Sequence, residues 1–259
     1  MDTTKQNSNA WDQKVEEGSR YTKSVSSETI EKGKAGKWNI TVTTEKPVPR
    51  SWFPRQLEGL KVLCLASGGG QQAPVLTAAG AQVTVTDISR KQLEKDRLVA
   101  ERDGLSLHTV QGDMRDLSVF EDETFDMIIH PVSNLFVDNI RPVWKEAARV
   151  LKKKGTLIAG FTNPLLFIFD DQQEQKGILD VKHPIPSSTL DQLPEEEVED
   201  HIRTNQTIEY AHTMEDQIQG QIDAGFAITG FYEDDFGGTR ILDQYIKTFI
   251  ATKAVKVVL

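Results

Sequence analysis

The chain has 259 residues, of which 38% are hydrophobic and 27% are charged, a composition typical of soluble globular proteins. Its single cysteine, Cys64, excludes an internal disulfide, and the polar amino terminus lacks the apolar segment of a secretory signal. No apolar run reaches the roughly eighteen residues that a membrane helix needs. We therefore expect a cytoplasmic protein without a membrane span.

The net charge of −9 comes from one part of the chain. Residues 165–240 contain 17 acidic and 4 basic side chains, a net charge of −13. A surface of this sign repels phosphate backbones, so the charge argues against a long nucleic acid as a partner. It favours a small molecule that is neutral or cationic.

Short apolar stretches alternate with helical patterns between residues 60 and 160. They predict five strands, at residues 61–65, 82–86, 106–110, 125–130 and 156–161. Short and almost continuously apolar strands are typical of a parallel sheet that helices cover on both faces.

Two of the predicted helices carry start and stop signals. Ser89 and Gln92 form a capping-box pattern, and Gly104 ends the helix that they begin. Asp138 is the predicted amino-terminal cap of the next helix. Lysines 152–154 are expected at the carboxyl-terminal end of that helix, where the helix dipole favours cations.

The regular alternation stops after the fifth strand. Residues 163–212 contain several prolines and an acidic run, which predict an insertion or lid. Two further strands are predicted at residues 226–232 and 245–251, and the short connection between them favours an antiparallel pair. Residues 1–55 are interpreted as an amino-terminal extension or cap that packs on the sheet or lines a pocket. The extension contains the aromatic residues Trp11, Tyr21, Trp38, Trp52 and Phe53.

A glycine turn follows the first strand and precedes a predicted helix at residues 72–79. Gly68, Gly69 and Gly70 allow a tight turn and a close approach of a ligand to the backbone. Asp87, at the end of the second strand, is placed to accept hydrogen bonds from a ribose diol. This combination predicts a site for a cofactor that contains a nucleoside.

Two classes of cofactor fit these residues. The spacing of Gly68, Gly70 and Ala73 satisfies the dinucleotide fingerprint, which leaves an NAD(P)-dependent oxidoreductase as an alternative. Residues 112–114 (GDM) after the third strand and the antiparallel end of the sheet argue against it, because dinucleotide-binding sheets normally continue with parallel strands.

The ordered motifs resemble those of class I S-adenosylmethionine-dependent methyltransferases, in particular the small-molecule branch that includes the quinone-biosynthesis enzymes. The motifs are residues 63–70 (LCLASGGG), 86–89 (TDIS), 112–114 (GDM), 125–129 (FDMII) and 149–157 (RVLKKKGTL). The resemblance implies an α/β fold of three layers (αβα) in residues 56–259. Its centre would be a Rossmann-like, doubly wound, seven-stranded sheet that is mostly parallel and has an antiparallel last strand.

The resemblance also implies roles for individual residues toward S-adenosylmethionine and its product S-adenosylhomocysteine. The backbone at Gly68 and Gly70 would lie against the methionine part of the cofactor, and Asp87 would bind the ribose hydroxyls. Asp113 would accept a hydrogen bond from the adenine amino group. The remaining residues expected at the cofactor are Ala66, Ser67, Gln71, Ile88 beside the adenine, Gly112, Met114 beside the ring, and His130.

Two residues depart from the family pattern. Cys64 stands where the family usually has an acidic residue, and Ala66 replaces the first glycine of the motif. Ser67, Gln71 or Gln72 could replace the hydrogen bond that the acidic residue would provide behind the methionine group. These departures motivate a second alternative, a regulatory protein that binds S-adenosylmethionine without catalysis.

Methyl transfer from a sulfonium is an in-line displacement, in which the protein mainly aligns the nucleophile and excludes water. His130 ends the fourth strand, at the edge where open α/β sheets bind ligands, and is the candidate for a general base or a substrate-orienting group. No metal-binding spacing is visible, and we expect no metal. The predicted function is methyl transfer to an unidentified small organic acceptor.

Overall fold

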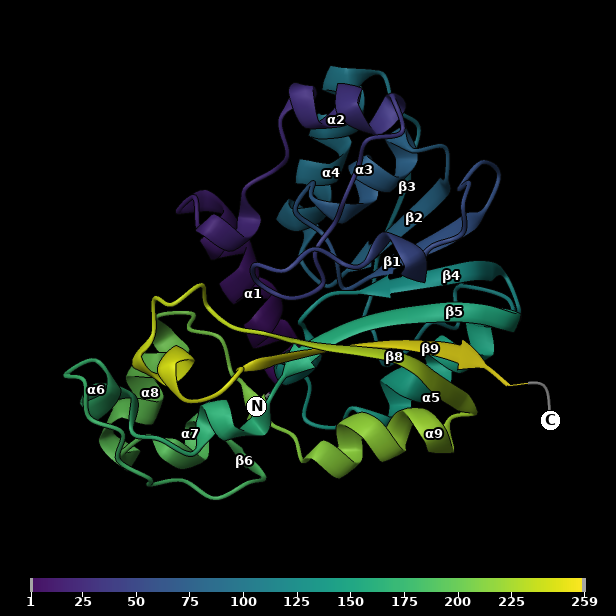
Figure 1. Cartoon of the computed structure of the whole chain (residues 1–259). Helices are drawn as coiled ribbons and strands as arrows, with labels where there is room; N and C mark the ends of the chain where they lie inside the picture. Colours follow the sequence, from purple (N-terminus) through teal and green to yellow (C-terminus); the bar gives the residue numbers. More distant parts are fainter. Residues whose placement is uncertain (1, 258–259) are drawn as a thin grey trace.

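A seven-stranded sheet forms the centre of the protein in the computed structural model, which describes residues 2–257 (Figure 1). The strand order is β3-β2-β1-β4-β5-β9-β8. Strands β1 to β5 pair in parallel, whereas β9 pairs antiparallel with both β5 and β8. The predicted sheet with a reversed last strand is confirmed. The strands are β1 (Lys61–Leu65), β2 (Gln82–Asp87), β3 (His108–Gln111), β4 (Phe125–His130), β5 (Leu151–Thr162), β8 (Phe226–Asp234) and β9 (Phe249–Lys256).

Helices cover both faces of this sheet, as the apolar strands predict (Figure 1). In β1, Val62 and Cys64 pack into the core on one face, and Leu63 and Leu65 pack into the core on the other. All four side chains are fully buried, so β1 has no solvent-facing side over these residues. One face is covered by α2 (Ser27–Lys34), α3 (Gln72–Ala78) and α4 (Arg90–Asp103), and the other by α5 (Arg141–Val150) and α9 (Gly220–Asp223).

The signals of helix α4 are confirmed, and those of α5 are wrong. The Ser89 hydroxyl accepts a hydrogen bond from the Gln92 N–H, and Gly104 ends α4 with a left-handed φ of 64°. Asp138 does not cap α5, because the helix begins three residues later; the Asp138 carboxylate forms an ion pair with Arg115. The helix begins at Arg141 with a proline in its first turn, after a residue that provides no side-chain cap.

Lysines 152–154 lie in β5 and not at the end of α5. The backbone becomes extended at Leu151, which pairs with Phe125 of β4. Residues 152–155 then bulge out of the ladder before pairing resumes at Thr156. Burial of Leu151 in the core therefore ends the helix before the lysines.

The amino-terminal residues fold against the same core as the sheet. Ile30, Ile40, Val42 and Phe53 are buried together with β1 residues. The extension contains α1 (Thr3–Glu16), α2 and two 3-10 helices, Arg20–Thr22 and Arg50–Trp52. The domain boundary at residue 55 stays a prediction.

Short elements make up the segment predicted as an insertion or lid, beside the ends of β5 and β9 (Figure 1). None of the helices within residues 2–257 is long and apolar enough to cross a membrane. The segment contains α6 (Asp171–Glu174), β6 (Ser187–Ser188), α7 (Thr189–Gln192), α8 (Glu195–Arg203) and β7 (Tyr210–Ala211). Further helical turns are the 3-10 helices Asn134–Phe136, Pro164–Phe167 and Ile241–Gln244 and the π-helix Glu215–Gln219 that precedes α9.

Candidate functional site

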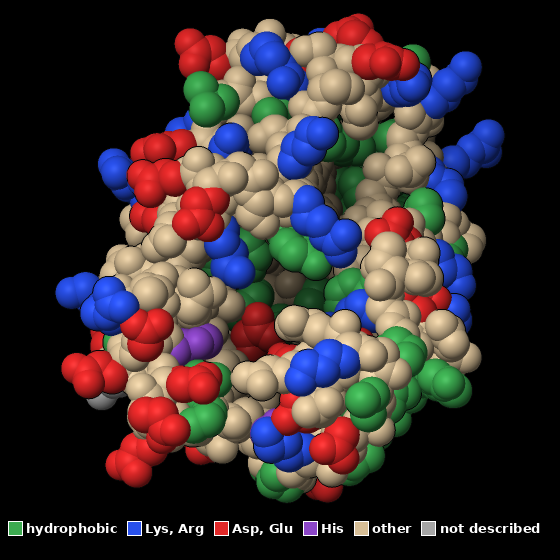
Figure 2. Space-filling model, turned by 90° about the vertical axis from the view of Figure 1, so that its left-hand side faces the viewer, with side chains coloured by type: hydrophobic (Ala, Val, Ile, Leu, Met, Phe, Trp, Pro, Cys, Tyr) green, Lys and Arg blue, Asp and Glu red, His purple; other side chains and the backbone are tan. Residues whose placement is uncertain are grey.

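A cleft of about 760 Å³ opens at the carboxyl-terminal edge of the parallel strands. Figure 2 shows a recess on this side of the molecule, with hydrophobic walls, basic side chains on its rim and an acidic side chain at depth. A volume of this size falls in the range of roughly 300–1,000 Å³ that small-molecule sites occupy. The walls come from the strand ends, from the amino-terminal extension and from the segment after β5.

Asp87 and the glycine turn form one hydrogen-bonded unit on the cleft wall. The Asp87 carboxylate accepts the Gly68 N–H at 2.9 Å with one oxygen and the Ser89 N–H at 2.9 Å with the other. Burial raises the pKa of Asp87 to about 6, against the lowering effect of these two donors. A side chain at position 68 would contact Gln92 at 2.7 Å, so glycine is required for this close packing.

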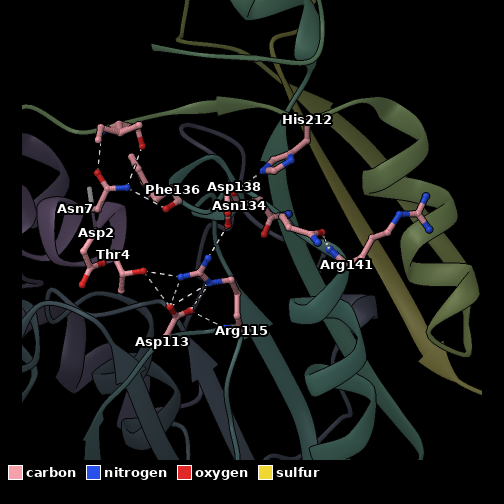
Figure 3. A network of polar contacts seen from close by, with 12 residues as sticks. Asp2, Thr4, Asn7, Asp113, Arg115, Asn134, Phe136, Asp138, Arg141 and His212 are labelled. Atoms are coloured by element: carbon pink, nitrogen blue, oxygen red, sulfur yellow. Dashed lines mark hydrogen bonds and ion pairs between the residues drawn. The ribbon is translucent and has the colours of Figure 1, made fainter. Parts of the chain in front are cut away.

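Asp113 lies in a polar network at another part of the cleft (Figure 3). The Arg115 guanidinium binds both carboxylate oxygens of Asp113, at 2.6 Å and 3.1 Å, and also contacts Asp138 at 2.6 Å. The Thr4 hydroxyl donates to Asp113 at 3.4 Å and accepts from Arg115 at 2.5 Å. Although burial opposes it, Arg115 keeps the pKa of Asp113 below its usual range. The carboxylate is therefore a fixed acceptor.

Most of the residues predicted at the cofactor line this cleft. Gly70 does not: its carbonyl accepts the Val25 N–H at 2.9 Å and faces the amino-terminal extension. A side chain at position 70 would contact the Ser24 hydroxyl at 2.7 Å. Gly70 therefore holds the extension in place. The predicted residues that line the cleft are Ala66, Ser67, Gly68, Gln71, Asp87, Ile88, Gly112, Asp113 and Met114.

His130 lies behind the cleft wall and is fully buried. Its Nδ1 is 3.0 Å from the Leu65 carbonyl oxygen, and its Nε2 is 2.5 Å from Asn134 Oδ1. Asn134 donates in turn to the Gln217 side chain at 2.7 Å. Burial lowers the pKa of His130. Because both ring nitrogens are engaged away from the cleft, the structure gives no support to the predicted role in acid–base catalysis or cofactor binding.

Helix α1 lies beside the cofactor-side wall, where Thr4, Trp11 and Lys14 line the cleft. Ser8 donates to the Ile88 carbonyl at 2.9 Å, and Asp12 accepts from the Ser89 hydroxyl at 2.6 Å. The sequence of α1 does not predict that the helix packs beside the cleft, because its buried side chains include polar residues and it has no apolar stripe along one face.

The opposite wall contains residues that no motif indicated. It comes from the segments that follow β4 and β5 and from the region around the β8–β9 connection. Of the predicted aromatic residues, Trp11 and Tyr21 line the cleft, whereas Trp38 packs on Phe53 and Trp52 packs on Tyr232. The newly found lining residues on this side include Leu135, Phe136, Leu166, Glu209, Phe236, Arg240 and Phe249.

A buried carboxyl group lies beneath the glycine turn. Asp96 of α4 is fully buried, and its Oδ2 accepts the Gly69 N–H at 3.0 Å. Burial raises the pKa of Asp96 to about 8. Leu93, Asp96 and Val99 are spaced three residues apart on the buried face of α4. An acidic residue at a position of the helix that the pattern expects to be apolar is the sequence signal that could have indicated this buried carboxyl group.

Comparison with known proteins identifies the family. A family model described as "Methyltransferase domain" matches residues 63–159. The chain is 59% identical to YbaJ of Bacillus subtilis, named an uncharacterized methyltransferase, over 97% of each chain. The protein is a class I S-adenosylmethionine-dependent methyltransferase.

Solved structures agree with the fold of this methyltransferase. An S-adenosylmethionine-dependent methyltransferase from Mesorhizobium loti is similar with a TM-score of 0.60 and 16% identity, over 80% of this chain and 94% of that one. A second structure, from Listeria monocytogenes, is similar with a TM-score of 0.59 and 17% identity, over 80% of this chain and 95% of that one. As a member of this family the protein uses S-adenosylmethionine as its cofactor, and neither the family model nor the relative favours the oxidoreductase alternative. Within residues 2–257, no group of three or more His, Cys, Asp or Glu residues is arranged to hold a metal ion.

Proposed function

We propose that this methyltransferase transfers the methyl group to a small organic acceptor by in-line displacement. The observation that carries the proposal is one continuous cleft that runs from the ends of β1, β2 and β3 to the ends of β4 and β5. Such a cleft can hold a cofactor at one end and an acceptor at the other. We also propose that the enzyme acts in the cytoplasm, a reducing compartment that would keep the free Cys64 thiol reduced.

The cofactor half of the cleft fits the chemistry of S-adenosylmethionine. We assign the ribose hydroxyls to Asp87, which is fixed by two backbone donors. The adenine amino group is assigned to Asp113, and the ring edge to Ile88 and Met114, which line the same wall. The methionine part is assigned to the turn formed by residues 66–68 together with Gln71.

The bound cofactor supplies a methyl group that is already activated by the positive sulfonium. The protein's contribution is to orient the acceptor against the wall at residues 131–137 and to exclude water from the cleft. Ideal alignment contributes on the order of 7–11 kcal/mol to such a displacement. A general base adds typically about 10²–10⁴-fold, and only when the acceptor must lose a proton. The buried position of His130 is therefore compatible with catalysis.

Titration calorimetry with S-adenosylmethionine tests the assignment. The full chain is expected to bind one equivalent, and Asp87→Ala is expected to weaken the affinity about tenfold or more, since a hydrogen bond to a charged group contributes about 1.5–3 kcal/mol. Asp116→Ala, at an exposed carboxylate close to Asp113 in the sequence, is the control and should bind like the wild type. Absence of binding at roughly millimolar ligand would contradict the proposal.

A further inference from the structure

Glu209 is an acidic residue of the cleft wall that also contains Phe136, Phe236 and Phe249. Glu209 precedes β7, and its backbone N–H donates to the Thr189 hydroxyl at 3.0 Å while its carbonyl accepts the Thr189 N–H at 2.8 Å. The main chain at this position is therefore held in place. Glu209 is one of the residues that line the cleft.

The Glu209 carboxylate is only weakly engaged by the protein. Its hydrogen bond from the Thr207 hydroxyl is long, at 3.3 Å. Within residues 2–257 no lysine, arginine or histidine nitrogen lies within the 4.0 Å of an ion pair to Glu209. Burial raises the pKa of this carboxyl group. The oxygens of a partly buried carboxylate without an ion pair can accept further hydrogen bonds from a ligand.

The charged groups that face Glu209 do not neutralise it. Arg240 contributes a positive charge, but its guanidinium is bound to the buried Glu174 and lies over the Phe236 ring at 5.0 Å. Asp171, near Arg240, adds a negative charge. Lys14 of α1 acts on Glu209 from a distance and lies over the Trp11 ring at 5.5 Å.

The surroundings of Glu209 in the acceptor half are apolar and aromatic. Phe236 and Phe249 pack edge to face with ring centroids 4.7 Å apart, and both line the cleft with Phe136 and Leu166. Aromatic faces attract cations as well as apolar groups. Glu209 belongs to residues 165–240, the segment with the acidic excess, and an excess of negative charge attracts cations.

We propose that the acceptor is a small amine with an apolar body, and that Glu209 binds its ammonium group as the specificity-determining residue. The aromatic wall would hold the apolar body, and the carboxylate would anchor the ammonium and accept one of its protons. The nitrogen lone pair would then attack the methyl group, and the cofactor would leave as S-adenosylhomocysteine. This inference rests on the proposed function, because it concerns the acceptor half of the same cleft.

Two matched series of probes test the inference on the complex with S-adenosylhomocysteine. One is phenethylamine, 2-phenylethanol and 3-phenylpropanoate; the other is 3-methylbutylamine, 3-methylbutanol and 4-methylpentanoate. Titration calorimetry should show that at least one amine binds about tenfold or more tightly than the alcohol and the carboxylate of its series. Glu209→Gln should abolish this preference, whereas Glu196→Gln, which removes an exposed charge from the same segment, should retain it.

The affinity for S-adenosylhomocysteine separates this inference from the proposed function. It is expected to be equal in the wild type and in both variants, because neither Glu209 nor Glu196 is among the residues assigned to the cofactor. If the cofactor product binds but neither amine binds at roughly 10 mM, the amine assignment is wrong. Equal or tighter binding of the alcohol or carboxylate, or an unchanged amine preference in Glu209→Gln, would overturn it as well. Failure of S-adenosylhomocysteine itself to bind would instead contradict the proposed function.

Discussion

Burial beneath the glycine turn opposes the ionisation of Asp96. Its Oδ2 accepts the Gly69 N–H, but its Oδ1 has no hydrogen-bond partner among the described residues. The pKa of about 8 in the folded protein compares with an ordinary value of 3.8. Between these two values the folded state binds more protons than the unfolded state, so the free energy of unfolding falls as the pH rises.

Asp96→Asn is expected to remove this pH dependence. Asparagine can accept from Gly69 without becoming charged, so the variant should gain melting temperature relative to the wild type between about pH 5 and pH 9. Differential scanning calorimetry across this range measures the difference. Glu101→Gln, at an exposed position of α4, is the matched control. If the melting temperatures of the wild type and of Asp96→Asn change in parallel with pH, Asp96 does not titrate in this range.

Ala66 carries backbone strain at the end of β1. Its φ of 47° lies in the left-handed region, which costs an L-residue roughly 1–2 kcal/mol relative to glycine. Ala66→Gly is therefore expected to increase the free energy of unfolding by about 1 kcal/mol. Urea denaturation measures this change. Ala79→Gly, at a φ of −80°, should not stabilise, and a loss of stability in Ala66→Gly would contradict the strain.

At the scale of elements, α1 connects the cofactor side of the cleft with the segment after β5. Asn7 donates from its amide nitrogen to the Phe136 and Ile208 carbonyls, each at 3.0 Å, and accepts the Ile208 N–H at 2.7 Å. The Asn7 side chain is fully buried. Figure 3 shows these contacts beside the network of Asp113 and Arg115. The helix therefore joins two walls of the cleft.

Asn7→Ala is expected to loosen this connection. It removes three hydrogen bonds and leaves buried groups unpaired, which costs about 1–3 kcal/mol for each unsatisfied group. We predict a lower melting temperature and faster dissociation of S-adenosylhomocysteine, which stopped-flow fluorescence can follow. Asn9→Ala changes the same residue type at an exposed position of α1 and should leave both quantities unchanged. If S-adenosylhomocysteine dissociates from Asn7→Ala at the wild-type rate, α1 does not control how fast the ligand leaves the cleft.

The elements differ in how far the sequence could predict them. The sequence predicts β1 and β2 almost to the residue, because β1 is apolar and buried on both faces and β2 is rich in β-branched residues. The end of α5 was missed, because Val150 and Leu151 continue the helical spacing while pairing with Phe125 extends the backbone. The role of α1 has no local signal, since its contacts involve residues more than a hundred positions away.

The residues of the site also differ in how far the sequence could predict them. Asp87 and Asp113 follow strands in recognisable motifs, and both line the cleft. His130 also follows a strand, but the pattern cannot indicate on which side of the wall its ring lies. Glu209 and Phe236 come from segments without a motif: Glu209 precedes β7, and Phe236 lies in the connection between β8 and β9.

At the scale of the whole molecule, the amino-terminal extension contributes to the main core. Val42 accepts the Val132 N–H at 3.0 Å with its carbonyl. It passes so close to Gly160 of β5 that a side chain there would lie 1.9 Å from the Val42 carbonyl oxygen. Ile30, Ile40 and Phe53 are buried in the same cluster. The extension is packed as part of the structure that supports the strand ends.

Removal of residues 1–55 is expected to prevent cooperative folding. Each buried apolar side chain contributes about 1.5–3 kcal/mol, and a whole domain is stable by only about 5–15 kcal/mol. The shortened chain should lack a calorimetric unfolding transition and a native near-ultraviolet circular dichroism spectrum. A cooperative transition would show that residues 56–259 form an independent domain.

A crystal structure of the full chain with S-adenosylhomocysteine tests the central claim most directly, because it locates both halves of the cleft at once. We predict that the ribose hydroxyls bind Asp87, that the adenine lies beside Ile88 and Met114, and that the sulfur faces the wall containing Phe136 and Glu209. A ligand bound outside the cleft, or one whose sulfur faces away from that wall, would contradict the account.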